Sequence, residues 1–196
     1  MPLPQKNTKY RIGFKKWSDE KVIELRKQLG LNASSPLCAF KLCDFLNIPV
    51  LIPSSVEGLS QEHLDMLLGD GSNHWSAVTI PFNNGTHIII HNPTHSPARQ
   101  QSNLMHELAH IICEHKISEK AKKTGLAGFL RNLDPEQEDE AEWLGACLQL
   151  PRPALLYSLN NGMTVKKIAE HYNCSTEMVQ YRINITGVKK QLSYKK

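Results

Sequence analysis

Residues 102–113 read SNLMHELAHIIC, and the five residues His106-Glu107-Leu108-Ala109-His110 within this stretch decide how the whole chain is interpreted. They match H-E-x-x-H, in which two histidines four residues apart lie on one face of a helix and can chelate zinc, with the glutamate placed as a general base. The opposite face of the helix is apolar, because four side chains fall within about 100° of arc: Leu104, Leu108, Ile111 and Ile112. We therefore expect one face to pack on the domain body and the imidazoles to face a cleft.

The segments before this helix give it a structural context. Ser96 fits an N-cap and Pro97 fits the first position of a helix that runs to about Glu114. Two β-rich runs, at residues 75–81 and 86–92, precede it and are joined through an Asn-Gly turn. Asn-Gly between β-formers predicts a β-hairpin.

The remaining pattern is mostly helical and predicts an α+β fold. A polar loop over residues 116–133 leads to a helix with Asp134 as N-cap that ends before Pro151. The other expected elements are a helix over 18–29 with Ser18 as N-cap, a helical stretch over 36–46 opened by Pro36, a strand over 49–53, a helix over 61–68, and two short helices after Pro153 that meet at 173–175. We expect the lysine-rich tail to be mobile.

Composition excludes several classes of protein. The chain has 196 residues, of which 40% are hydrophobic and 21% charged, so it is neither disordered nor fibrous. It has no apolar run of about 20 residues, and its first residues lack the apolar stretch of a secretory signal, so we expect a cytoplasmic protein without membrane spans. Five cysteines without a C-x-x-C pair are interpreted as reduced thiols.

Two histidines leave a tetrahedral site short of a third protein ligand, for which the sequence offers five candidates: Glu138, Glu140, Glu142, Cys113 and His115. Cys113 follows too closely on the same helix and is interpreted as a core residue, and His115 as a cap or surface residue. Glu138 and Glu142 share a helix side with the small residues Ala141 and Gly145, which would allow close approach to the histidine helix. Helical periodicity favours these two glutamates but does not separate them.

This combination of a hairpin, an H-E-x-x-H helix and an acidic helix resembles the ImmA/IrrE family of bacterial and phage metallo-endopeptidases. The resemblance covers the hairpin that ends at residues 88–92, the H-E-x-x-H helix, and the run Glu138-Asp139-Glu140-Ala141-Glu142 that leads to Leu150-Pro151. The family pattern is similar to E-x-E-A-N followed by small and aliphatic residues and Met-Pro. Here Glu142 stands in place of Asn, and Leu150 in place of Met.

The resemblance implies a zincin-like metallopeptidase fold, with a small sheet packed on a helical body. It implies His106, His110 and Glu138 as zinc ligands, with manganese as a possible substitute in vitro, and Glu107 as general base. The strand before the zinc helix would hold the substrate in extended form by edge pairing.

The C-terminal helices resemble a DNA-binding helix-turn-helix. Residues 164–196 carry seven Lys or Arg against two Glu, a local charge of +5, and Lys166, Lys167 and Arg182 are candidate phosphate contacts. We expect a metallopeptidase domain over residues 1–163, with these helices packed on the same unit. Direct DNA contact is the less favoured of their two roles.

The leading hypothesis is therefore a zinc endopeptidase that, by family resemblance, cleaves a helix-turn-helix repressor and releases genes of a mobile element or a stress response. One alternative is a metal-containing protein that sequesters a repressor or toxin without proteolysis. Another is a DNA-binding regulator that uses residues 164–186. Glu107 favours the first hypothesis, because sequestration needs no general base.

Overall fold

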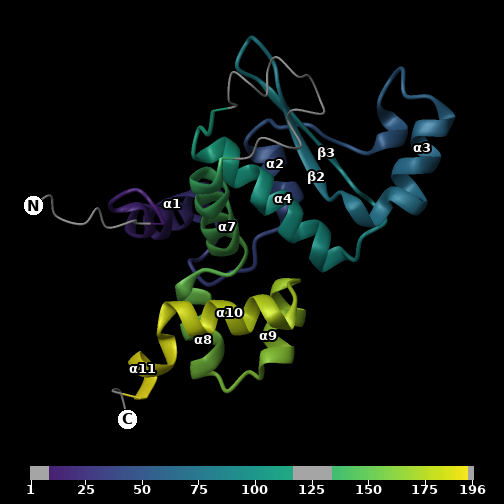
Figure 1. The fold of residues 1–196 in the computed structure, drawn as a ribbon. Coiled ribbons are helices and arrows are strands. Elements are labelled where there is room, and N and C mark those ends of the chain that lie inside the picture. The colour runs from purple at the N-terminus through teal and green to yellow at the C-terminus, as the bar shows by residue number, and fades with distance from the viewer. Residues whose placement is uncertain (1–8, 117–133, 194–196) are drawn as a thin grey trace, which may run out of the picture.

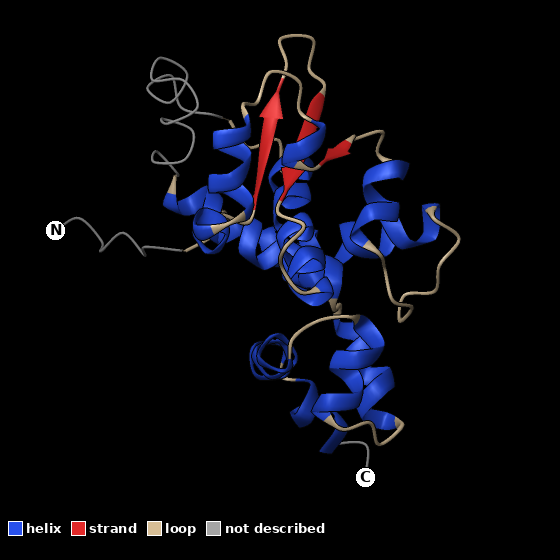
Figure 2. Ribbon diagram, turned by 90° about the vertical axis from the view of Figure 1, so that its right-hand side faces the viewer, coloured by secondary structure: helices blue, strands red, loops and turns tan. Residues whose placement is uncertain are grey.

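The computed structural model describes residues 9–116 and 134–193, so most of the loop predicted over 116–133 lies outside the described residues. In chain order the elements are α1 (Phe14–Gln28), α2 (Ala39–Phe45), β1 (Val50–Leu51), the 3-10 helix η1 (Pro53–Ser55), α3 (Gln61–Leu68), the 3-10 helix η2 (Asp70–His74), β2 (Ala77–Pro81), β3 (His87–His91), α4 (Pro97–Ile112), α7 (Pro135–Gln149), α8 (Arg152–Asn160), α9 (Val165–Tyr172), α10 (Thr176–Thr186) and α11 (Val188–Ser193). The predicted α+β class is confirmed: helices dominate, with one small sheet beside them (Figure 2). No helix in the described ranges has both the length and the apolar character that crossing a membrane requires.

The sheet has three strands in the order β1-β3-β2. β2 pairs antiparallel with β3, with Ala77 opposite His91 and Pro81 opposite His87, so the predicted hairpin is confirmed. β1 pairs with β3 in parallel on the other side. The expectation that the strand before α4 offers a free edge is wrong, because β3 is the central strand. Among the described residues, the free edges of this sheet belong to β1 and β2.

Helices α4 and α7 lie side by side at the centre of the molecule (Figure 1) and approach each other at a glycine. A Cβ atom on Gly145 of α7 would lie 3.1 Å from the carbonyl oxygen of Met105 and 3.2 Å from the Cα of His106. Ala141, one turn earlier on α7, is fully buried. The prediction that small residues let these two helices pack closely is confirmed.

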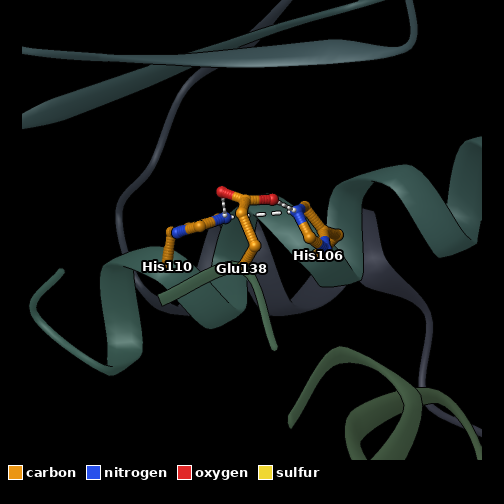
Figure 3. Close-up of side chains that lie close together, drawn as sticks. All are labelled: His106, His110 and Glu138. Atoms are coloured by element: carbon orange, nitrogen blue, oxygen red, sulfur yellow. Dashed lines mark hydrogen bonds and ion pairs between the residues drawn. The ribbon is translucent and has the colours of Figure 1, made fainter. Parts of the chain in front are cut away.

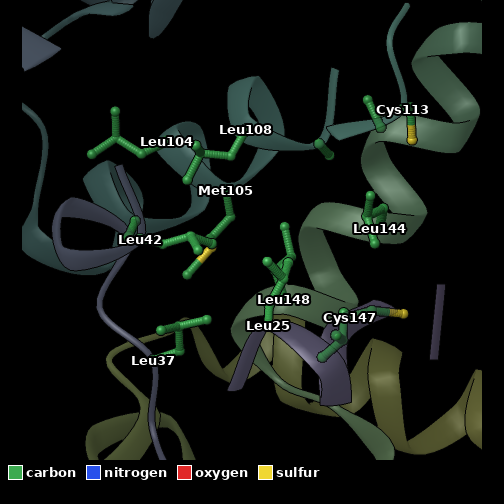
Figure 4. Packing of buried hydrophobic residues seen from close by; sticks show 14 of the residues in the cluster. Leu25, Leu37, Leu42, Leu104, Met105, Leu108, Cys113, Leu144, Cys147 and Leu148 are labelled. Carbon is green, nitrogen blue, oxygen red and sulfur yellow. The ribbon is translucent and has the colours of Figure 1, made fainter. Parts of the chain in front are cut away.

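The buried face of α4 is rotated from the predicted one. Leu104 and Leu108 are fully buried as expected, and so are Met105 and Ala109, whereas Ile111 and Ile112 are only partly buried. The reason is the close approach of α7, which covers the side of α4 that carries Met105. This face joins side chains of α1, α2 and α7 in the main hydrophobic core (Figure 4).

A second hydrophobic cluster lies among the C-terminal helices, which form the lower part of the molecule in Figure 1. Its buried members start at Leu150 and include Leu155 of α8, Ile168 of α9 and Val179 of α10. Helix α8, which packs with the helices that follow it, was not predicted from the sequence. The division of the chain at residue 163 stays a prediction.

Two buried arginines connect α7 to helices that are distant in sequence. Arg26 of α1 donates from Nη2 to the Leu148 carbonyl at 2.7 Å, and Arg182 of α10 donates from Nε to the Leu150 carbonyl at 3.0 Å. Carbonyls at a helix C-terminus have no partner within the helix, so these guanidinium groups supply the missing donors. Both arginine side chains are fully buried.

Three predicted boundaries differ from the structure. α1 begins at Phe14, and the Ser18 hydroxyl donates to the Phe14 carbonyl at 2.8 Å inside the helix instead of capping it. α2 begins at Ala39, three residues after Pro36. In the tail that was expected to be mobile, Val188–Ser193 form α11, and Val188 is fully buried in the second cluster; residues 194–196 lie outside the described residues.

Candidate metal centre

Two histidines of α4 and one glutamate of α7 meet between these helices. His106 and His110 lie one helical turn apart, and Figure 3 shows their imidazoles directed at the Glu138 carboxylate. The two Nε2 atoms are 3.1 Å apart, Nε2 of His106 lies 3.3 Å from Oε2 of Glu138, and Nε2 of His110 lies 3.2 Å from Oε1. These three residues are called the triad below. Their side chains are 21–34% exposed, so solvent and a substrate can reach them.

The spacing within the triad suits a tetrahedral metal ion. Zinc binds imidazole nitrogen and carboxylate oxygen at about 2.0–2.2 Å, which places neighbouring ligand atoms about 3.3–3.6 Å apart in a tetrahedron. The observed separations of 3.1–3.3 Å lie within a few tenths of an ångström of that range. Two imidazoles and one carboxylate are also a donor set that catalytic zinc sites use. The triad therefore fits a zinc ion whose fourth position is left open.

The triad residues shift one another's pKa values. Burial opposes the charged form of Glu138, but hydrogen bonds from His106 and His110 outweigh burial and lower its pKa to about 2. Burial likewise opposes the charged form of His106, but its hydrogen bond to Glu138 and the nearby charge of Glu107 outweigh burial and raise its pKa. The site therefore stabilises positive charge, as a cation-binding site must.

Glu107 lies beside the triad and is held by strand β2. The Thr79 hydroxyl donates to Oε2 of Glu107 at 2.6 Å, and Thr79 sits in the middle of β2, opposite Ile89. Thr79 was not predicted from the sequence. The alternation of side chains along β2 indicates which residues lie on the same side of the strand as Thr79. It does not indicate which side faces α4, and burial does not separate the two sides either, because all five residues of β2 are half-buried.

The other carboxylate and thiol candidates do not join the triad. Glu142 is exposed on α7, and Glu140 is buried on a different side of the helix. Cys113 is a buried member of the main core, as predicted, and burial raises the pKa of its thiol to about 12, so the thiol stays protonated at neutral pH. All five cysteines are free thiols in the structure.

His115 was interpreted as a cap or surface residue: its backbone does cap the end of α4, but its side chain is largely buried and not at the surface. Glu114 adopts a left-handed conformation with φ of 56°, and the backbone N–H of His115 donates to the His110 carbonyl at 3.0 Å, the long-range bond of a Schellman motif. This turn folds the chain back over the end of α4. The His115 side chain is only 8% exposed, and its Nδ1 lies 2.9 Å from Nδ1 of His110.

Comparison with protein families matches residues 66–184 to the Peptidase M78 family, described as the IrrE N-terminal-like domain. The chain belongs to this family. The match spans more than half of the sequence and includes β2, β3, α4 and α7, which carry the triad and Glu107. The resemblance to the ImmA/IrrE metallopeptidases is thereby confirmed. Searches among curated proteins and among solved structures gave no match.

Membership of Peptidase M78 makes this chain a metallopeptidase by family, a hydrolase that depends on a metal. The matched region begins within α3 and ends within α10. Helices α1 and α2 and strand β1 precede it, although their side chains complete the core around α4.

Proposed function

We propose that this M78 protein is a zinc endopeptidase in which His106, His110 and Glu138 bind the metal and Glu107 is the general base. The observation that supports this most strongly is the convergence of three side chains, each pair of which brings two donor atoms within 3.1–3.3 Å, beside a separately held carboxylate. A structural metal site would fill its fourth position with another protein ligand. In the described residues no fourth side chain joins the group.

Glu107 carries out the proton transfers of the proposed reaction. A zinc ion in the triad supplies Lewis-acid chemistry, lowering the pKa of water and polarising a carbonyl. Glu107 takes a proton from the attacking water as its oxygen bonds to the peptide carbon, and then gives that proton to the leaving amine as the C–N bond breaks. Thr79 fixes one Glu107 oxygen at 2.6 Å and leaves the other for this transfer.

The proposed substrate segment is an extended peptide. β2 is an edge strand whose partner β3 occupies only one side, and Thr79 places this strand next to Glu107. A peptide that adds to the free edge would present its backbone to the general base by main-chain hydrogen bonds. We further propose that the substrate is a helix-turn-helix repressor whose cleavage releases mobile-element or stress-response genes, and the family resemblance supports this.

The C-terminal helices are proposed to pack against the peptidase rather than to read DNA. Arg182 was a candidate phosphate contact for the less favoured DNA-binding role, but it is fully buried and donates to the Leu150 carbonyl. Lys166 and Lys167 are exposed, so the remaining cations near these helices are on their surface. A regulator that binds DNA through residues 164–186 would have to do so without Arg182.

The experiment combines the purified chain with a candidate helix-turn-helix repressor and follows cleavage with zinc or manganese present. Glu107→Gln keeps the shape and the triad but removes the base. We expect cleavage by the wild-type chain and a loss of about 100- to 10,000-fold in the variant, with zinc content unchanged. Equal cleavage by both proteins would overturn the assignment of Glu107. A stable complex without cleavage by either would favour sequestration.

A further inference from the structure

Two further side chains, those of His115 and Glu140, extend from His110 of the triad into the interior of the protein, each in contact with the one before it. Nδ1 of His110, the ring nitrogen directed away from the triad, lies 2.9 Å from Nδ1 of His115. Nε2 of His115 lies in turn 3.4 Å from Oε2 of Glu140. The side chains of His115 and Glu140 are 8% and 9% exposed, so water has little access to these contacts.

Arg11, in the segment before α1, contacts Glu140, the residue of this series that is farthest from the triad. The backbone N–H of Arg11 donates to Oε1 of Glu140 at 3.2 Å, and its guanidinium lies 3.6 Å from Oε2. Arg11 is itself placed over the rings of Phe14 and Trp17, 5.0 Å from each ring centroid. Arg11 precedes residues 66–184, so this contact comes from outside the region that matches the family.

We propose that His115 and Glu140 are positioning residues of the metal site and that Arg11 holds Glu140 in place for this task. A histidine that offers Nε2 to a metal carries its ring proton on Nδ1, and this proton needs an acceptor. Nδ1 of His115 accepts it, so the proton of His115 is on Nε2 and is donated to Glu140. One arrangement of protons thus satisfies both rings and fixes the orientation of His110. The inference rests on the proposed function, because it concerns the same site.

The same side chains do not form a second metal site. Cys113, His115 and Glu140 bring possible ligand atoms within 4.8 Å of one another. The Arg11 guanidinium already lies beside the Glu140 carboxylate, and a fixed cation there repels a metal ion. The Cys113 side chain belongs to the hydrophobic core. These residues are therefore better suited to supporting the triad than to binding an ion of their own.

The test measures the zinc affinity of the full chain by competition with a chromophoric chelator, with the zinc content per chain as a second readout. His115→Phe keeps a ring but removes both nitrogens, and Glu140→Gln keeps the shape but removes the charge. Each is expected to weaken zinc binding about 10- to 100-fold, the usual effect of losing such a partner. His115→Asn, which retains an acceptor close to the position of Nδ1, is expected to recover part of the loss.

Two variants are matched controls. Glu142→Gln changes an exposed glutamate on the same helix as Glu140, and His171→Phe replaces an exposed histidine on α9; both are expected to bind zinc like the wild type. Ring ¹⁵N shifts of His110 in the zinc-loaded chain give a readout that loss of packing alone would not move. They are expected to show one fixed tautomer in the wild type and ring mobility in His115→Phe.

Each outcome has a distinct meaning. Unchanged zinc affinity in folded Glu140→Gln and His115→Phe overturns the inference and leaves the proposed function intact. If His115→Phe does not fold, the zinc affinity of Glu140→Gln alone tests the inference. A wild-type chain that binds no zinc overturns the proposed function and the inference with it. Two zinc ions per wild-type chain, with one lost in His115→Phe, also overturn the positioning role.

Discussion

Glu107 has one carboxylate oxygen fixed by a single hydroxyl, that of Thr79 at 2.6 Å. Thr79→Val keeps the shape of the side chain but removes this donor, so Glu107 can turn away from its working orientation. We expect kcat to fall about tenfold, the effect of one hydrogen bond to a charged group. Zinc content should stay the same, and Thr79→Ser should retain most of the activity. Wild-type kcat in Thr79→Val would show that Glu107 is positioned by something else.

As a proposed metal ligand, His106 is expected to make metal binding depend on pH. Its pKa is raised from the ordinary value of 6.5, and a protonated imidazole does not bind zinc, so affinity is retained above the raised pKa and lost as the pH falls through it. Glu138, with a pKa of about 2, stays ionised in this range and contributes nothing to the change. We expect apparent affinity to fall about tenfold or more from about pH 8 to about pH 5.5, measured by competition with a chelator. A flat profile would contradict the assignment of His106 as a ligand.

The residues of the proposed metal site were predictable to different degrees. His106, Glu107 and His110 follow from one local pattern, because residues four apart share a helix face. Choosing Glu138 over Glu142 required the family resemblance, since both lie on the same side of their helix. The contact of His115 with His110 depends on a left-handed residue at a helix end, which no hydrophobic pattern shows.

At the scale of elements, the site depends on the close crossing of α4 and α7. Alanine normally stabilises a helix interior by about 1 kcal/mol relative to glycine. At Gly145, however, the added Cβ would lie 3.1–3.2 Å from backbone atoms of Met105 and His106, so α4 has to move. We expect Gly145→Ala to lower the free energy of unfolding by about 1–3 kcal/mol and to weaken zinc binding.

Denaturant unfolding and zinc titration of Gly145→Ala check this, with Glu142→Ala as an exposed control on the same helix. A more stable Gly145→Ala protein with unchanged zinc affinity would show that the contact between α4 and α7 accommodates an added methyl group.

Helix starts with a local capping signal were predicted well. Ser96 and Asp134 both accept hydrogen bonds from the first turn of their helices, as the predicted N-caps should. Ser18 has the same chemistry but lies inside α1, because the helix begins earlier, after Gly13 in a left-handed conformation. Which strand lies at the sheet edge depends on the pairing of β1 with β3, a contact between distant parts of the chain.

At the scale of the whole molecule, Arg182 connects the C-terminal helices to α7. Arg182→Ala leaves the Leu150 carbonyl without its donor and opens a cavity between α10 and the rest of the protein. We expect the free energy of unfolding to fall by about 2–4 kcal/mol, measured by denaturant titration. Neutralising the exposed Lys166 and Lys167 should leave stability unchanged. An Arg182→Ala protein of wild-type stability would contradict the structural role of this arginine.

Much of the packing between elements of the whole molecule was not predictable from the sequence of this chain. The fold class and the order of the helices around the motif follow from local periodicity and turn residues. The hydrogen bonds of the buried Arg26 and Arg182 to the end of α7 join residues 122 and 32 positions apart, and the division into two hydrophobic clusters depends on how the helices pack. A basic residue that is buried against a helix end cannot be distinguished, by sequence pattern alone, from one that contacts phosphate.

The most direct test of the central claim is a crystal structure of the zinc-loaded chain with anomalous data at the zinc absorption edge. We predict one strong peak bounded by Nε2 of His106, Nε2 of His110 and a carboxylate oxygen of Glu138, at about 2.0–2.2 Å from each. A peak among Cys113, His115 and Glu140 instead, or none in the protein, would contradict the assignment of the triad as the metal site.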